Sequence, residues 1–168
     1  MNDRAPAPGE LALVEALVNT LDVEKGADSL DTEDGRTAFG LAEADVPAAR
    51  ELREALRAAC LAHAGHDVPT ESLDRLLAAA PLLVTVDGAG AAALRPADPE
   101  ALVSRVAAAI ATATADGTWL RLKACEAQDC LWAYYDRSPA GRSRWCTMAV
   151  CGSRAKMRKY RAGRARSS

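Results

Sequence analysis

Apolar residues recur at helical spacing in four stretches of the first 117 residues, and each stretch predicts an amphipathic helix. The first stretch spans residues 11–21. The second begins at Val46-Pro47, a favourable helix start, and continues as an apolar stripe through Cys60 to His63. Because Cys60 lies on this stripe, we expect its thiol to be a small buried apolar group. A metal site made by Cys60 and His63 alone would lack further ligands.

The third and fourth helices flank a short β-hairpin. Thr70 is the expected N-cap of the third helix. Residues 82–86 and 91–95 are mainly apolar and enclose a glycine-containing turn, so they predict two antiparallel strands. The fourth helix begins at Asp-Pro-Glu in residues 98–100 and ends at Gly117.

The chain beyond Gly117 follows a different pattern. Alternating residues over 119–123 predict a strand that leads into Cys125. Residues 131–135 and 142–146 predict two strands joined by a polar turn, and residues 152–164 predict a helix.

These patterns divide the chain into four parts. We expect a flexible leader over 1–9, a mainly helical domain over 10–117, a small second domain over 118–164 and a tail over 165–168. Residues 22–36 of the first domain, rich in Asp, Glu and Gly, are expected to form an exposed acidic loop.

Four of the five cysteines form two matched pairs in the second domain. Cys125 and Cys130 are separated by four residues, and so are Cys146 and Cys151, with fifteen residues between the pairs. Two such pairs can converge on one tetrahedral Zn²⁺, which we expect to be structural. The finger would then consist of a knuckle, a hairpin and a helix that begins at its last ligand. The predicted fold class is therefore α+β, with a treble-clef-like four-cysteine zinc finger after the helical domain.

Other uses of the four cysteines have less support. Two disulfides would require an oxidising compartment, and nothing in the sequence indicates export. An iron–sulfur cluster is compatible with ligation by four cysteines. Catalytic zinc needs an open coordination position, which four thiolates do not leave. We expect the folding of so small a finger to depend on the metal, so that chelation melts residues 122–164 and spares the helices before them.

Charge is distributed very unevenly along the chain. Residues 121–168 hold twelve basic and three acidic residues, a net charge of +9, whereas the other 120 residues carry −11. This polarity predicts an anionic partner at the basic end, although attraction between the two halves would also explain it. Arg154, Arg158 and Arg161 share one face of the last helix, and we expect them to contact DNA phosphates. The complete set of predicted DNA contacts is Arg154, Lys156, Arg158, Lys159, Arg161 and Arg164.

The C-terminal part also resembles a known family, the CGNR-type zinc fingers of bacterial regulators that carry an N-terminal ABATE domain. The resemblance is strongest over 122–161, and Leu17-Val18-Asn19-Thr20-Leu21 is similar to the opening of the ABATE domain. It places the four cysteines on the metal positions of the family. Its other typical residues are Asp136, Ser138, Arg144, Trp145, Gly152, Arg154 and Lys156, and the first five of these are expected to be structural or to support the metal ligands. Ser153 stands where the motif has Asn, so any role of that amide is lost here.

The resemblance implies a bacterial, stress-linked transcriptional regulator, and the basic C-terminal end favours DNA as its partner. Its first domain would sense a small-molecule effector or form a homodimer. The alternative is a protein-interaction adaptor whose basic end docks on an acidic surface, such as its own loop 22–36. We expect no enzyme, because no paired carboxylates, nucleophile elbow or histidine-centred cluster occurs. No apolar run approaches the ~18 residues of a membrane span, so we expect a cytoplasmic protein.

Overall fold

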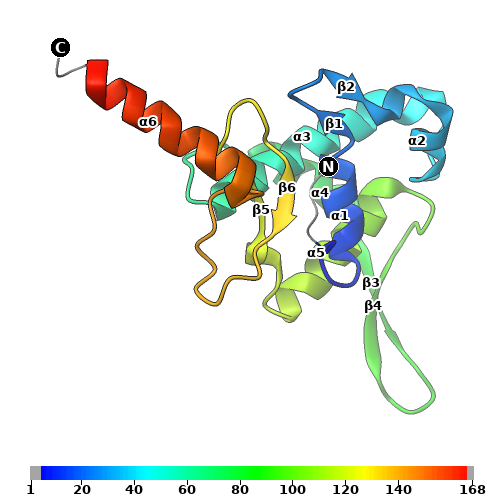
Figure 1. Ribbon diagram of the computed structural model, residues 1–168. Helices are drawn as coiled ribbons and strands as arrows, with labels where there is room; N and C mark the ends of the chain where they lie inside the picture. The colour runs from blue at the N-terminus through cyan, green and yellow to red at the C-terminus, as the bar shows by residue number, and fades with distance from the viewer. Residues whose placement is uncertain (1–4, 166–168) are drawn as a thin grey trace.

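The computed structural model describes residues 5–165, except for the side chains of Lys159 and residues 163–165. It combines six α-helices with short strands that form three two-stranded antiparallel sheets, so the predicted α+β class is confirmed (Figure 1). The leader residues 1–4 and the tail residues 166–168 lie outside the described residues. Within the described part, no helix is both long and apolar enough to cross a membrane.

Helices α1 (Leu11–Val18), α3 (Val46–His63) and α5 (Leu102–Ala115) form the centre of the hydrophobic core, and α4 (Glu71–Ala78) packs beside α3 and α5. The apolar stripe predicted for α3 is buried, and Leu56 and Cys60 on it have no exposed surface. Thr70 is the residue before α4, as predicted, but its side chain makes no capping hydrogen bond.

The first helix ends at Val18, three residues earlier than predicted. Asn19 leaves the helix because its side chain pairs with the backbone of a distant strand. Its amide nitrogen donates to the carbonyl of Ala133 at 3.0 Å, and its oxygen accepts from the Ala133 N–H at 2.7 Å. The helical periodicity through Leu21 did not reveal this long-range competitor.

The segment predicted as an acidic loop has regular structure. It contains strands β1 (Leu21–Asp22) and β2 (Ala27–Asp28), a 3₁₀ turn η1 (Ser29–Asp31) and the short helix α2 (Glu33–Thr37). Asp28 receives hydrogen bonds from Arg53 at 2.8 Å and from Arg50 at 3.0 Å. A turn η2 (Glu43–Asp45) then leads directly into α3. The prediction of a plain loop was wrong because acidic residues here act as caps and ion-pair partners.

The predicted hairpin is present as β3 (Leu82–Val86) and β4 (Ala92–Pro96), one residue beyond the predicted second strand. Asp98 accepts hydrogen bonds from the N–H groups of Glu100 and Ala101, so it stabilises the turn before α5 rather than the first turn of α5 itself. Gly117, with a φ of +67°, follows the end of α5 as predicted.

The strands of the C-terminal part are paired differently from the prediction. Residues 119–121 form a 3₁₀ turn, η3 (Trp119–Arg121), and only β5 (Leu122–Ala124) is extended. Leu120 is 67 % exposed while Leu122 is buried, so the apparent alternation did not reflect a continuous strand. β5 pairs with β6 (Ala133–Tyr135), and residues 142–146 form no strand.

The hydrophobic core continues from the helices into the C-terminal strands. Leu122 and Ala124 of β5, and Ala133 and Tyr135 of β6, belong to the same buried cluster as α1 and α3. His63 on α3 also contacts the Leu122 carbonyl at 2.7 Å and the Trp119 ring edge-on at 4.8 Å between centroids. The division of the chain at Gly117 therefore stays a prediction about sequence organisation, since packing crosses it.

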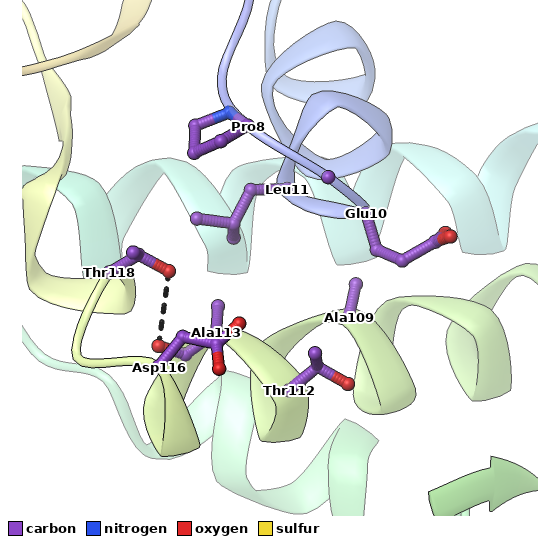
Figure 2. Close-up of a pocket in the computed structure, with 9 residues that line it drawn as sticks. Pro8, Glu10, Leu11, Ala109, Thr112, Ala113, Asp116 and Thr118 are labelled. Atoms are coloured by element: carbon purple, nitrogen blue, oxygen red, sulfur yellow. Dashed lines mark hydrogen bonds between the residues drawn. The ribbon is translucent and has the colours of Figure 1, made fainter. Parts of the chain in front are cut away.

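A small hollow lies where the start of α1 meets the end of α5 (Figure 2). Its volume is about 100 Å³, and Leu11 and Ala113 are among its lining residues. The Thr118 hydroxyl closes one end by donating to the Ala113 carbonyl at 3.2 Å (Figure 2). This space is well below the several hundred Å³ of a typical ligand pocket, so we regard it as a packing defect.

Candidate metal centre and basic helix

The first cysteine pair lies in the tight connection between β5 and β6. The Cys125 N–H donates to the Trp132 carbonyl at 2.9 Å, and the Cys130 N–H donates to the Ala127 carbonyl at 2.8 Å. Leu131, directly after Cys130, has a φ of +53°, which is a costly conformation for a non-glycine residue. Arg57 of α3 donates to the Leu131 carbonyl at 2.7 Å and so holds this turn in place.

The second pair lies at the entrance to the last helix. Cys146 precedes a π-helical turn, η4 (Met148–Gly152), which carries Cys151 and continues directly into α6 (Ser153–Ala165). The Cβ of any residue replacing Gly152 would lie 2.8 Å from the Met148 sulfur and 3.2 Å from the Trp145 ring. A larger residue would force the Met148 and Trp145 side chains to shift, so glycine suits this close turn, which places Cys151 opposite Cys146.

The four sulfur atoms converge on one point. Cys125, Cys130, Cys146 and Cys151 have sulfur atoms that all lie within 4.8 Å of one another. The Cys130–Cys146 and Cys146–Cys151 separations are 3.6 Å. Zinc–sulfur bonds of about 2.3 Å in a tetrahedron place sulfurs about 3.8 Å apart, so these positions fit one Zn²⁺. The predicted cofactor is confirmed: the four cysteines are positioned to bind one metal ion, consistent with one structural zinc.

The alternatives considered for these cysteines fit the geometry less well. All five cysteines are free thiols, and 3.6 Å far exceeds the ~2.05 Å of a disulfide bond. An iron–sulfur cluster with several irons would hold the four cysteine sulfurs farther apart than a single metal ion does. Cys60 takes no part, because it lies in the helical core. Burial there raises the pKa of its thiol to about 12.

The electrostatics of the thiols show why a cation belongs here. Hydrogen bonds from Cys130 and Cys146 lower the pKa of Cys125, whereas burial raises the pKa of Cys151. Four crowded thiols therefore cannot all ionise without a positive charge among them. A bound Zn²⁺ would supply that charge and displace the thiol protons, so metal affinity should fall as the pH is lowered.

A buried aspartate organises the loop that leads to the second cysteine pair. Asp136 has no exposed surface and accepts hydrogen bonds from the N–H groups of Ser138 at 3.0 Å and Ser143 at 2.9 Å. Burial alone would raise the pKa of Asp136, but the hydrogen bonds to Ser138 and Ser143 outweigh it and the pKa lies well below its usual value. Lys123 neutralises the carboxylate, with its ammonium 3.2 Å away. The loop is thus held by one carboxylate in place of the hairpin ladder that the sequence predicted.

Arg144 closes the finger on its other side. Its guanidinium pairs with Glu126 at 2.6–2.7 Å and lies over the Trp145 ring, 5.4 Å from the ring centroid. The Glu126 N–H also donates to the Arg144 carbonyl at 3.1 Å. Arg144 therefore ties the first knuckle to the chain that enters the second. The Arg144 guanidinium is thus already paired within the molecule, with Glu126.

Helix α6 leaves the metal centre and extends away from the rest of the molecule (Figure 1). Its thirteen residues include no acidic residue. Its basic residues, which include all six predicted DNA contacts, are Arg154, Lys156, Arg158, Lys159, Arg161 and Arg164. The side chains of Lys159 and Arg164 lie outside the described part of the structure.

Two of the described arginines on α6 make ion pairs within the molecule. Arg154 donates to Glu24, in the turn between β1 and β2, at 2.9 Å. Arg158 lies 3.7 Å from Asp129 in the first knuckle. These pairs are half-exposed and therefore weak, so an external anion can replace them.

Comparison with known proteins identifies the C-terminal part of the chain. Residues 121–164 match the CGNR zinc finger family. The matched segment begins just before β5 and contains all four cysteines, Asp136, Arg144 and nearly all of α6. The predicted resemblance of this finger is thereby confirmed, while the similarity of the first domain to the ABATE domain stays a prediction. No curated protein matches the chain.

Sequence analysis missed the residues that join the finger to the helical core. Asn19 and Arg57 both bond to the backbone around β6, and Arg57 also donates to the Val18 carbonyl at 2.9 Å. No sequence signal indicated Arg57, because its burial is visible only in the structure, and a charged residue is seldom buried without partners. The Asn19–Thr20 pair was noticed only through its family resemblance.

Proposed function

We propose that this protein is a DNA-binding transcriptional regulator in which the zinc centre presents α6 to the phosphate backbone. One observation carries the proposal: a helix with six basic and no acidic residues projects from the four-cysteine cluster, away from the acidic body of the protein (Figure 1). The described side chains of Lys156, Arg158 and Arg161 are exposed. Helices of this size and charge bind DNA mainly through phosphate contacts, with base contacts added in the major groove.

The zinc ion would have a positioning role. It would hold Cys151 two residues before α6 begins, so the metal and the close turn at Gly152 would set the direction of the helix. The chemistry that zinc supplies is coordination of four thiolates, which leaves no position for a substrate or a nucleophilic water. We therefore propose a binding protein and no catalytic activity.

The helical part would serve as the sensor of the regulator. A cavity of about 340 Å³ lies between the start of α3, the end of α4 and the start of α5. Leu52 and Leu102 form part of an apolar floor, and Asp45 and Glu100 are also among the lining residues. Its volume falls within the range of small-molecule sites. It supports the proposal of an effector, whereas the hollow in Figure 2 is too small for one.

An adaptor without sequence-specific DNA binding is the second candidate, and the Arg154–Glu24 pair favours it. That contact supports docking of α6 on an acidic surface, the alternative predicted for segment 22–36. The same side of α6 also exposes Val150 and Met157, 46 % and 50 % accessible, beside Arg161. These residues line a hollow beside α6, and an acidic protein surface with apolar side chains would fit it.

Genomic footprinting with the zinc-loaded full chain separates the two candidates. A regulator should protect a small set of related sequences, and Arg158→Ala/Arg161→Ala should erase this protection while zinc content stays at one per chain. Arg75→Ala/Arg95→Ala removes equal charge far from α6 and should leave the footprints intact. An adaptor would give no footprint with any of the three proteins, and that result would overturn the proposal.

A further inference from the structure

The β3–β4 ribbon projects from the helical core into solvent (Figure 1). Only its base lies against α5. The side chains of Val84 and Val86 are 70 % and 66 % exposed, and Leu83 and Leu94 are 52 % and 42 % exposed. An isolated two-stranded ribbon is at best marginally stable in water. We therefore expect another strand to stabilise a ribbon that exposes this much apolar surface.

One face of the ribbon is entirely apolar. In the antiparallel register, Leu82 pairs with Pro96, Val84 with Leu94, and Val86 with Ala92. Cross-strand partners and alternate residues of a strand share a face, so all of these side chains lie on the same side. The opposite face carries Leu83, Thr85, Ala93 and Arg95.

The outer edge of β3 also has unpaired backbone groups. The Asp87 N–H donates to Ala91 and the Ala97 N–H donates to Pro81, which fixes the positions of the hydrogen-bonded pairs. Because such pairs alternate along an antiparallel ladder, the N–H and C=O groups of Leu82, Val84 and Val86 point away from β4. Within the described residues, no other segment pairs with this edge.

The edge of β3 is better suited to further pairing than the edge of β4. β4 ends in Pro96, which has no N–H, and lies closer to α5 than β3 does. Charged residues and proline normally protect an edge strand from pairing, and residues 82–86 contain neither. The edge is therefore open over its whole length.

We propose that the β3 edge pairs antiparallel with β3 of a second copy of this chain, about a two-fold axis at Val84. In that register Val84 lies opposite Val84 of the other copy, and Leu82 lies opposite Val86. The segment is thus complementary to itself, in its backbone groups and in its apolar side chains. Since residues 82–86 are uncharged, two copies do not repel each other along the edge, and charge gives no preference for a basic or acidic partner. Isologous two-fold pairing is also the commonest oligomeric arrangement.

The product is a four-stranded sheet with a continuous apolar face. It gives Leu82, Val84 and Val86 apolar cross-strand neighbours and satisfies three N–H and three C=O groups of each copy. This inference rests on the ribbon alone and is independent of the proposed DNA binding by α6.

Proline substitutions on the two edges give a matched test. Val84→Pro removes an N–H that points out of the β3 edge, and Leu94→Pro removes one that points out of the β4 edge. Neither N–H belongs to the internal ladder. In sedimentation velocity with zinc-loaded full chain, we expect wild type and Leu94→Pro at twice the 17.7 kDa chain mass and Val84→Pro at the chain mass.

Lysine substitutions provide a second pair of variants that keep every backbone N–H. Val84→Lys places two like charges opposite each other across the two-fold axis and should give monomers. Leu94→Lys places its charge on β4, one strand away from the β3–β3 seam, and this variant should stay dimeric. Circular dichroism and zinc content verify that each variant is folded. A monomeric wild type at all concentrations, which would leave a strand of another protein as the occupant, overturns the proposal. So does a folded Val84→Pro or Val84→Lys that remains dimeric.

Discussion

At the scale of single residues, Cys60 and Cys146 are both buried thiols with different surroundings. Cys60 touches helical core residues and has a raised pKa, whereas Cys146 lies 3.6 Å from two other cysteine sulfurs. Burial alone therefore does not identify a ligand; the neighbouring sulfurs do. The spacing of the four cysteines along the chain was sufficient to predict this difference.

Zinc content tests the assignment of the ligands. Cys146→Ser should lower bound zinc well below one per chain, because the site loses a thiolate, and the finger should become sensitive to proteolysis. Cys60→Ala, the matched control, should keep one zinc and lose about 1 kcal/mol of stability from a small cavity. Elemental analysis of both purified variants decides it. Zinc retained at full occupancy in Cys146→Ser contradicts the assignment.

Asp28 should make the stability of the protein depend on pH. Burial opposes ionisation of Asp28, but hydrogen bonds from Arg53 and Leu30 outweigh it and the pKa is lowered. A lowered folded pKa contributes stability above the unfolded value of about 3.9, and this contribution is lost as the pH falls through the folded pKa. Asp28→Asn should therefore cost roughly 2 kcal/mol at neutral pH, because a charged hydrogen-bond partner of buried Arg53 is removed.

The measurement is the difference in unfolding free energy between wild type and Asp28→Asn at a series of pH values. Metal loss in acid affects both proteins and cancels in this difference. It should be constant above about pH 5 and shrink below about pH 4. A difference that stays constant into acid would show that the carboxylate charge of Asp28 is not what stabilises the fold.

At the scale of elements, the long amphipathic helices were predicted well because burial alone determines them. The failures occurred where distant groups compete for the backbone. Asn19 ends α1 by bonding to Ala133, and Asp136 replaces the expected hairpin after β6 with a loop around one carboxylate. The periodicity of apolar residues reveals neither competitor. Asn19 lies far along the chain from the backbone that it binds, and Asp136 acts through a local network of hydrogen bonds.

The short helix α2 offers a test of this element-scale packing. A Cβ on Gly35 would lie 1.9 Å from the carbonyl oxygen of Ser29, which is backbone and cannot move aside cheaply. Gly35→Ala should therefore destabilise the protein by roughly 3 kcal/mol, even though alanine favours helices. Gly88→Ala, where a Cβ meets nothing within 4 Å, is the control and should be neutral. Equal unfolding midpoints of the two variants in urea would contradict the structure around α2.

At the scale of the whole molecule, the metal centre and the helical core share two strands. The sequence predicted that chelation melts all of 122–164. Tyr134 of β6 packs in the separate cluster around the cysteines, whereas Leu122 and Ala124 of β5 and Ala133 and Tyr135 of β6 belong to the main core. We therefore expect a narrower effect, in which metal loss releases the knuckles and α6 while β5 and β6 stay packed on α1 and α3.

Hydrogen exchange before and after chelation tests this expectation. Amides of Leu122–Ala124 and Ala133–Tyr135 should remain as protected as those of α3. Amides of residues 126–131 and 148–158 should exchange many times faster once zinc is removed. Simultaneous loss of protection in α3 would show instead that the chain unfolds as a single cooperative unit.

The central claim is that zinc-anchored α6 binds DNA through its basic side chains. Duplex binding measured by fluorescence anisotropy over a series of salt concentrations tests it most directly. Wild type should bind with a steep salt dependence. Arg158→Ala/Arg161→Ala should weaken binding roughly tenfold per contact and flatten the slope of log affinity against log salt by roughly two units. Arg75→Ala/Arg95→Ala should match wild type. Binding absent from wild type at low salt, or unchanged in the α6 variant with zinc still bound, contradicts the account.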